Sequence, residues 1–285
     1  MAQRAVLFIM TDMADVTSPF GTYALKKRDA QLLRWAQGMP ASWIGRRAAL
    51  ILRKTVLMSK CKVVDAVAEG LKFRLYMTDN VSERKFLFLP QFFDRFERRL
   101  LRERLANGSV FLDIGANAGI YSMTAAACVG DDGRVISIEP NPVVLDRLKF
   151  NMALNGFEKR MSVEQSCVGD AEGTVDLTLD DTNLGGSSLV AARSSNKISV
   201  ACYPLLTILK KYQIEKIDAL KIDIEGAEDK ALIPFLQGAP ETLLPKIMIL
   251  ENSPSQWQQD LPAALVKAGY KLLKTTRMNM VWERA

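Results

Sequence analysis

From Ser109 onward, short apolar segments alternate with segments of helical periodicity, and this alternation restricts the possible folds more than any other feature. The predicted strands cover residues 110–114, 134–139, 162–168, 219–224 and 246–251, and the predicted helices cover 120–129, 142–155 and 228–236. Strands that alternate with helices form a largely parallel sheet. We therefore predict an α/β fold with a doubly wound sheet, completed by an antiparallel hairpin at residues 270–283.

The first 105 residues have a different pattern and are predicted to form an extension to this core. Helices are predicted at residues 24–37, 42–60 and 92–106, and a hairpin at 63–67 and 71–76. This part of the chain holds 20 Lys and Arg against 10 Asp and Glu, a net charge of +10, whereas residues 106–285 have a net charge of −4. The asymmetry indicates either an anionic partner, such as phospholipid, a phosphorylated glycan or nucleic acid, or a solvated basic face.

The predicted helix at residues 42–60 is amphipathic and cationic, and Ser42 is its expected N-cap. Its basic residues recur at a spacing of seven, and apolar residues that include Ile44, Ile51 and Met58 occupy the other side. We expect this apolar side to pack on the core; contact with an anionic membrane surface is the alternative, because both uses need one apolar stripe and a basic face.

The composition excludes several kinds of chemistry. The chain of 285 residues has ordinary globular fractions of 48% hydrophobic and 25% charged residues, and it contains no histidine. Ser-His-Asp and Cys-His catalysis and histidine metal sites are therefore excluded. The four cysteines form no C-x-x-C pair, and no apolar stretch is long enough for a signal peptide or a membrane span, so we expect inert thiols and a cytoplasmic protein.

The strongest motif joins the strand at residues 110–114 to the helix after it. Asp113, Gly115 and Gly119 form the pattern D-x-G-x-N-x-G, in which the glycines let the backbone approach a ligand closely. A dinucleotide site would have G-x-G-x-x-G instead, so an NAD-dependent oxidoreductase is the weakest hypothesis. A carboxylate at the end of this strand suits a ligand that carries ammonium and sulfonium charges, which indicates S-adenosylmethionine.

Two further strand ends support an adenosine ligand. Glu139 ends the next strand, 24 residues after Gly115, where a carboxylate accepts hydrogen bonds from both ribose hydroxyls. The third strand ends near Val168 and Asp170, where we expect a backbone acceptor and a carboxylate for the adenine amino group. The alternative for Asp170 is a turn residue.

Three stretches of the chain resemble the FkbM-type S-adenosylmethionine-dependent methyltransferases. They are Phe111 to Met123, the Glu139-Pro140-Asn141 corner, and the string Leu220-Lys221-Ile222-Asp223-Ile224-Glu225-Gly226-Ala227-Glu228; Phe96-Glu97 and Gly186-Ser187-Ser188 also match. The resemblance implies a class I methyltransferase domain over residues 106–285, with a Rossmann-like seven-stranded sheet and O-methylation of a sugar or another hydroxylated acceptor. It also implies that Asn117, Tyr121 and Asn141 belong to the cofactor site. One departure is Leu206, where many relatives carry an aspartate.

The transfer chemistry is assigned to carboxylates. A hydroxyl nucleophile needs a base or a Lewis acid, and Asp223, Glu225 and Glu251 follow strands next to the glycine strand. Either Asp223 takes the proton directly, which we favour, or Asp223 and Glu251 hold Mg²⁺. The partner of Lys221 stays open: it is either a carboxylate of the site or solvent at the sheet edge.

Two other functions remain as alternatives to O-methylation of a glycan, glycolipid or small metabolite. The basic extension is compatible with an RNA methyltransferase, although it lacks the interleaved aromatic residues of a single-strand stacking surface, so we do not expect nucleic acid. A non-catalytic module at the membrane periphery would not need the intact motifs. We expect acceptor specificity to reside in residues 180–190 and in the extension, and the protein to contact the inner face of the membrane at most peripherally.

Overall fold

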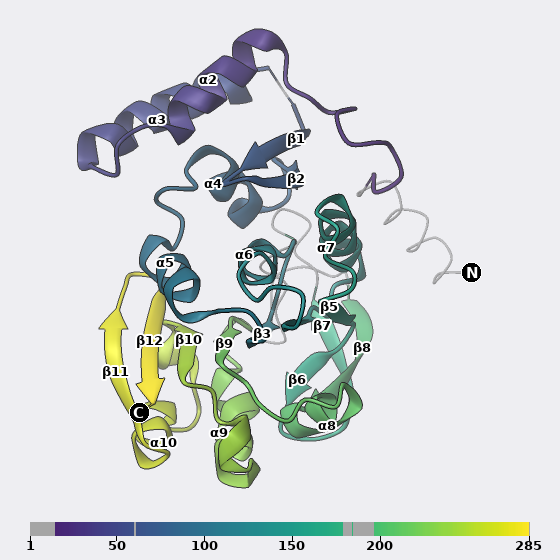
Figure 1. Ribbon diagram of the computed structural model, residues 1–285, viewed down its shortest axis with the longest axis vertical. Helices are drawn as coiled ribbons and strands as arrows, with labels where there is room; N and C mark the ends of the chain where they lie inside the picture. Colours follow the sequence, from purple (N-terminus) through teal and green to yellow (C-terminus); the bar gives the residue numbers. More distant parts are fainter. Residues whose placement is uncertain (1–14, 60, 179–183, 185–196, 285) are drawn as a thin grey trace.

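The computed structural model describes residues 15–59, 61–178, 184 and 197–284. Its centre is a seven-stranded sheet with the order β11-β12-β10-β9-β3-β4-β5 (Figure 1). The strands are β3 (Val110–Ile114), β4 (Arg134–Ile138), β5 (Met161–Glu164), β9 (Ala219–Ile222), β10 (Ile247–Glu251), β11 (Tyr270–Thr275) and β12 (Asn279–Arg284). Six strands of this sheet run in one direction, and β12 runs in the opposite direction between β11 and β10. The doubly wound sheet and the antiparallel C-terminal pair are thus confirmed.

Helices cover both faces of the sheet because successive strand residues point to opposite sides. Phe111 and Val135 pack toward one helical layer, and Leu112 and Ile136 pack toward the other. The first layer contains α5 (Arg95–Arg104), α6 (Ile120–Ala126) and α7 (Pro142–Leu154); the second contains α8 (Leu205–Lys211), α9 (Glu228–Gly238) and α10 (Leu261–Lys267). The short helix α10 was not expected from the sequence. None of the described helices is both long and apolar enough to cross a membrane.

The N-terminal extension contains a helix pair and a hairpin, as predicted, and one further helix. Its elements are α2 (Lys27–Gln37), α3 (Trp43–Leu57), β1 (Val63–Ala68), β2 (Leu71–Tyr76) and α4 (Val81–Phe88). The Ser42 side chain accepts a hydrogen bond from the Gly45 amide and caps α3, as expected. The unpredicted α4 is capped by Asn80, whose side chain accepts from the amides of Ser82 and Glu83. Helix α5 is shorter than the predicted 92–106.

One buried arginine ties the extension to α7. The Arg147 guanidinium lies 2.7 Å from an Asp79 carboxylate oxygen and 3.1 Å from a Glu83 oxygen. It also stacks 3.6 Å from the centre of the Tyr76 ring. Breaking a buried ion pair by removing one partner typically costs about 3–5 kcal/mol, so this cluster fixes the extension against the sheet domain.

The predicted strand at residues 162–168 is wrong as a single element. It divides into β5, which pairs with β4, and β6 (Cys167–Gly169), which belongs to a separate three-stranded sheet with β7 (Gly173–Thr178) and β8 (Lys197–Pro204). An apolar run does not specify which strand will pair with it, so the break at Ser166 was not visible in the sequence. The sequence places a polar, Gly- and Ser-rich insert between Gly173 and Tyr203. Residues 179–183 and 185–196 of this insert, which include Gly186-Ser187-Ser188, lie outside the described residues.

Candidate active site

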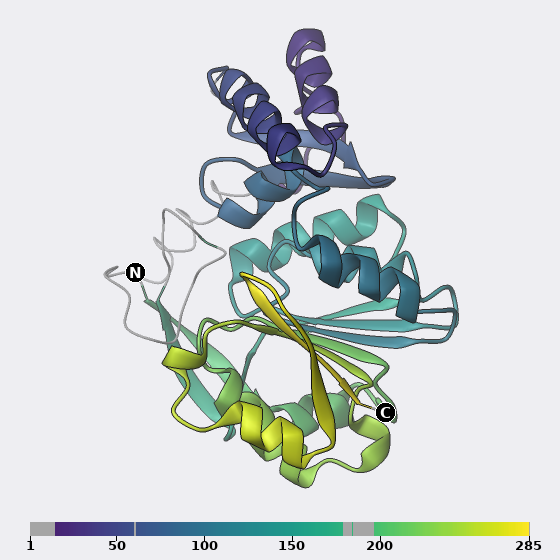
Figure 2. The same ribbon diagram turned by 90° about the vertical axis from the view of Figure 1, so that its left-hand side faces the viewer.

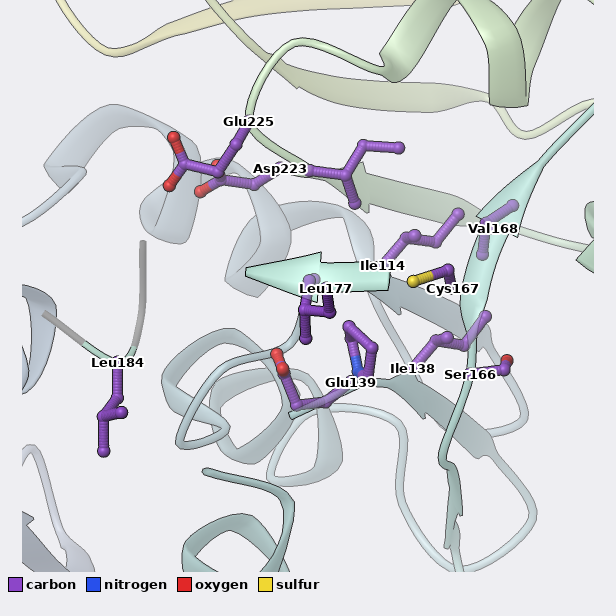
Figure 3. Close-up of a pocket in the computed structure, with 13 residues that line it drawn as sticks. Ile114, Ile138, Glu139, Ser166, Cys167, Val168, Leu177, Leu184, Asp223 and Glu225 are labelled. Carbon is purple, nitrogen blue, oxygen red and sulfur yellow. The ribbon is translucent and has the colours of Figure 1, made fainter. Parts of the chain in front are cut away.

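A pocket opens where β3, β4 and β9 end, with about 540 Å³ of free space that includes its solvent-open part (Figure 3). Its polar lining includes Glu139, Asp223 and Glu225, and its apolar lining includes Val168, Leu177 and Leu184. Since β3 lies between β9 and β4, Asp223 and Glu139 are on opposite sides of the glycine turn. This is the edge at which parallel α/β sheets bind ligands.

The glycine turn after β3 brings the backbone of two strands close together. Gly115 has a φ of +73°, and a Cβ atom there would lie 1.9 Å from the Asp223 carbonyl oxygen. The Gly115 amide donates to the Ile138 carbonyl at 2.9 Å, which joins the ends of β3 and β4. Gly119, with a φ of +87°, is the N-cap residue that precedes α6. Asn117 has a φ of +52°, and its side-chain oxygen accepts from Asn80 Nδ2 at 2.6 Å, so the extension holds this turn.

Glu139 lines the pocket and is held from behind by backbone. Its two carboxylate oxygens accept hydrogen bonds from the amides of Asn117 and Asn141, each at 2.9 Å. Burial raises the pKa of Glu139 to about 7, although these two hydrogen bonds oppose the shift. Asn141 is fully buried and caps α7 by accepting from the Val143 amide at 3.1 Å. Asn141 therefore positions the strand end from outside the pocket lining.

Asp113 lies behind the pocket, on the α6 side of the sheet. Ser122 Oγ donates to one Asp113 oxygen at 2.5 Å, and Ser137 hydrogen-bonds to Ser122 at 2.8 Å. The other Asp113 oxygen is buried and has no hydrogen-bond partner among the described residues. Burial raises the pKa of Asp113. This carboxylate is not part of the pocket lining, so its predicted contact with the cofactor stays a prediction.

Lys221 pairs with the principal catalytic candidate. Its ammonium nitrogen lies 3.1 Å from Asp223 Oδ2 and 5.1 Å from the centre of the Tyr121 ring. The Tyr121 hydroxyl in turn donates to Asp94 at 3.1 Å. Burial opposes the charge of Lys221, but Asp223 and Asp113 outweigh this effect and raise its pKa. The open question about Lys221 is thereby answered, and Tyr121 supports this pair from outside the pocket lining.

Three carboxylates gather around the ends of β9 and β10. Asp223 and Glu225 line the pocket, and Figure 3 shows their carboxyl groups side by side. Burial, reinforced by the charge of Asp223, raises the pKa of Glu225 to about 7 and that of Glu251 to about 8. Glu251 is not among the lining residues, and one of its oxygens is buried without a hydrogen-bond partner among the described residues.

Glu228 holds the loop that carries Glu225. It begins α9, and its carboxylate accepts from the Ile224 amide at 2.9 Å and from Trp257 Nε1 at 2.8 Å. Glu228 therefore fixes the conformation of the 224–228 loop.

The structure separates other predicted residues from the pocket. Asp170 is exposed after β6 and does not line the pocket, so nothing in its position favours a contact with adenine. Leu206 packs in the α8–α9 layer, with its Cδ1 atom 3.5 Å from where a Cβ of Gly238 would lie. Among the described residues, no group of three or more acidic or cysteine side chains has a geometry that could hold a metal ion.

Sequence reasoning missed several residues of the site. Ser166 lines the pocket, and its hydroxyl is buried with no partner among the described residues. Leu177 and Leu184 supply an apolar wall from the insert. Cys167 and Cys202 are far apart in the sequence but are paired in register on the neighbouring strands β6 and β8. Burial raises the pKa of Cys167 to about 12, which agrees with an inert thiol. None of these residues stands in a motif.

Comparison with known proteins identifies the family. The profile of the methyltransferase FkbM domain matches residues 113–276. Methyltransferase sdnD of Sordaria araneosa is 25% identical over 211 residues, which cover 62% of this chain and 78% of that protein.

Two solved structures are similar to this chain at low sequence identity. A methyltransferase from Geobacter sulfurreducens has 12% identity and a TM-score of 0.42, with 92% of this chain and 97% of that chain covered. TYW2 of M. jannaschii, solved in complex with AdoMet, has 13% identity and a TM-score of 0.40, with 79% and 87% covered. The family profile spans more than half of this chain. The chain therefore belongs to the FkbM family of S-adenosylmethionine-dependent methyltransferases.

Proposed function

We propose that the protein methylates a hydroxyl oxygen of a glycan, a glycolipid or a small hydroxylated metabolite, with Asp223 as the proton acceptor. The observation that carries the proposal is the pairing of Asp223 and Glu225 on one side of the glycine turn, with Glu139 on the other side. The side with Glu139 then binds the nucleoside, and the side with Asp223 and Glu225 binds the reacting hydroxyl.

The residues of the pocket fit the adenosine half of S-adenosylmethionine, which when bound supplies a methyl group on a positively charged sulfur. Each Glu139 oxygen accepts one backbone amide and keeps lone pairs for ribose hydroxyls. The buried, unpartnered hydroxyl of Ser166 provides a hydrogen-bonding group beside the apolar side chains of Val168 and Leu177, a combination that suits a purine base. Gly115 has no side chain, so the turn presents only backbone atoms to the ligand.

A carboxylate base follows from the chemistry of the acceptor and from the absence of histidine. A hydroxyl group has a pKa far above 7, so a positioned base must take its proton during transfer. Asp223 is suited to this role because Lys221 fixes one of its oxygens at 3.1 Å and its side chain remains 39% exposed at the pocket. Glu225, with a pKa of about 7, exchanges protons with solvent near neutral pH and can receive the proton from this site.

Mg²⁺ held by Asp223 and Glu251 is the other way to acidify the hydroxyl. The two residues come from adjacent strands, but Glu251 does not line the pocket. No contact among the described residues favours this route over a direct base. Activity measured with and without a chelator distinguishes the two routes.

The experiment uses purified protein, methyl-labelled S-adenosylmethionine, and separate fractions of glycans, glycolipids, hydroxylated metabolites and RNA. We expect label in an O-methyl ether of one of the first three fractions. Asp223→Asn should lower kcat roughly 10²- to 10⁴-fold, the usual contribution of a positioned base. Calorimetry should show nearly unchanged affinity for S-adenosylhomocysteine, because Asp223 serves the acceptor side.

The matched control is Asp146→Asn, which removes a carboxylate that is 55% exposed on α7 and should leave both readouts unchanged. Near wild-type turnover by Asp223→Asn would contradict the role of this residue. Label only in ribonuclease-sensitive material would replace the acceptor class with RNA. Loss of activity with chelator and recovery with Mg²⁺ would replace the direct base with a metal.

A further inference from the structure

The outward side of α3 presents an apolar stripe that no described part of the protein covers. Ile44, Ile51 and Met58 are 72%, 69% and 75% exposed. Their spacing of seven places them on one line along the helix. The expectation that these residues pack on the core is therefore wrong. The side of α3 that packs inward carries Gly45 and Ala49, small residues that let α3 approach its neighbours closely.

Cations and a tryptophan flank this stripe. Arg47 and Lys54, both exposed, follow Ile44 and Ile51 by three positions and therefore lie beside the stripe on the same side of the helix. The expectation that the basic residues occupy the opposite side is wrong for these two. Trp43 is 69% exposed, and the Arg47 guanidinium lies 4.5 Å from the centre of its ring. Residues 26–59 hold eight Lys and Arg against one acidic residue, Asp29. Both ribbon views show α2 and α3 together at one end of the molecule, beyond the hairpin (Figures 1 and 2).

We propose that α3 docks on the surface of an anionic lipid bilayer, with Ile44, Ile51 and Met58 inserted between the headgroups and the surrounding cations on the lipid phosphates. Helices of this kind, apolar on one side and rich in Lys and Arg beside it, lie in the interfacial plane of membranes. Tryptophan is enriched at the same depth because its ring is amphipathic. The proposal is independent of the acceptor assigned to the active site.

The charge and the apolar area together favour a bilayer over other occupants. A second copy of the chain would bring the same basic surface against itself, and the like charges would repel. Nucleic acid would pair with the cations but would leave the aliphatic stripe without an apolar partner. An anionic bilayer provides phosphates and hydrocarbon at adjacent depths, and so matches both.

The test is co-sedimentation of the full chain with vesicles of phosphatidylcholine alone or of phosphatidylcholine mixed with phosphatidylglycerol. We expect pelleting with the mixed vesicles only, decreasing as salt is raised from about 0.15 M to about 1 M, because the Debye length falls from about 8 Å to about 3 Å. A variant with Arg46→Gln, Arg47→Gln and Lys54→Gln should partition roughly 10²-fold more weakly. A second variant, with Ile44→Gln, Ile51→Gln and Met58→Gln, should also lose binding while circular dichroism remains unchanged, because these positions are exposed and glutamine is a good helix former.

The matched control is Val266→Gln, which removes an apolar side chain that is 62% exposed on α10 and should bind vesicles as the wild type does. Equal pelleting with both vesicle types, or none with either, would overturn the proposal. So would unchanged binding by the apolar variant. A dimer in light scattering that this variant converts to a monomer would assign the stripe to a second copy. RNA binding that needs the cations and not the stripe, without vesicle binding, would assign the surface to nucleic acid.

Discussion

Lys221 and Asp223 are two positions apart on β9 and its loop, so both side chains point to the same face, and their charged groups lie 3.1 Å apart. Asp113 occupies the register position beside Lys221 on β3. A buried ammonium is stable only with such partners, because desolvation of an unpaired charge is costly. At the scale of single residues, the pocket is thus a set of carboxylates held by donors behind them: Lys221 behind Asp223, and two backbone amides behind Glu139.

Glu139→Ala should weaken the binding of S-adenosylhomocysteine by about 1.5–3 kcal/mol, the range for hydrogen bonds to a charged group. Isothermal calorimetry measures the difference, and thermal unfolding reports whether the variant still folds. Asp170→Ala is the comparison, because Asp170 is exposed and does not line the pocket, and it should bind like the wild type. Wild-type affinity in the Glu139 variant would remove this residue from the ribose site; a loss in the Asp170 variant would restore Asp170 to the adenine site.

At the scale of elements, the glycine turn depends on the contact between the ends of β3 and β9. Nothing larger than hydrogen fits at Gly115, because a Cβ would meet the Asp223 carbonyl oxygen at 1.9 Å. The same contact places the carbonyl of Asp223 against the glycine turn. A substitution at Gly115 therefore strains both sides of the pocket together.

Gly115→Ala and Gly156→Ala separate backbone strain from crowding. Both glycines have positive φ, +73° and +67°, but a Cβ at Gly156 would meet nothing within 4 Å. Gly156→Ala should cost only the strain of the left-handed conformation, about 1–2 kcal/mol. Gly115→Ala should cost about 1–3 kcal/mol more, because the added methyl must displace the β9 loop. Urea unfolding measures both, and equal losses would show that the close approach has no energetic consequence.

At the scale of the whole molecule, the extension and the insert are built into the wall of the pocket. The Leu184 amide donates to the Asp79 carbonyl at 2.7 Å, and the Leu184 carbonyl accepts from Asn141 at 3.3 Å. Asn80 holds the glycine turn through Asn117. The β2–α4 corner of the extension thus contacts both the glycine turn and the insert.

Stability should fall as pH rises from about 5 to about 8. Burial raises the pKa of Glu83, Glu139 and Glu225 to about 7 and that of Glu251 to about 8, from an ordinary value of 4.5. The folded state therefore binds more protons than the unfolded chain across this range, and the stabilisation present below the unfolded pKa is lost as each group ionises. Urea midpoints across the range measure the slope, and Glu251→Gln should reduce it. Stability that rises over this interval would contradict the assignment.

The sequence by itself determined the alternating elements, the glycine turn, and the positions of Glu139, Asp223 and Glu225 at strand ends. These features depend on periodicity and on residues close together in the chain, and strand ends in a parallel sheet meet at one edge whatever the rest of the fold does. Helix α4 was missed because its eight residues have no clear apolar period, although the Asn80 cap was a usable signal.

Only the tertiary structure decided the division of residues 162–168 between two sheets, the partner of Lys221, the exposure of Asp170, the pocket position of Ser166 and the uncovered stripe on α3. Each of these depends on which distant segment lies alongside. An apolar strand has the same sequence in either sheet, and the side of α3 that carries Ile44 has the same pattern whether it is buried or exposed. Burial and pairing are set by contacts between segments far apart in the chain, and residue type and spacing do not encode these contacts locally.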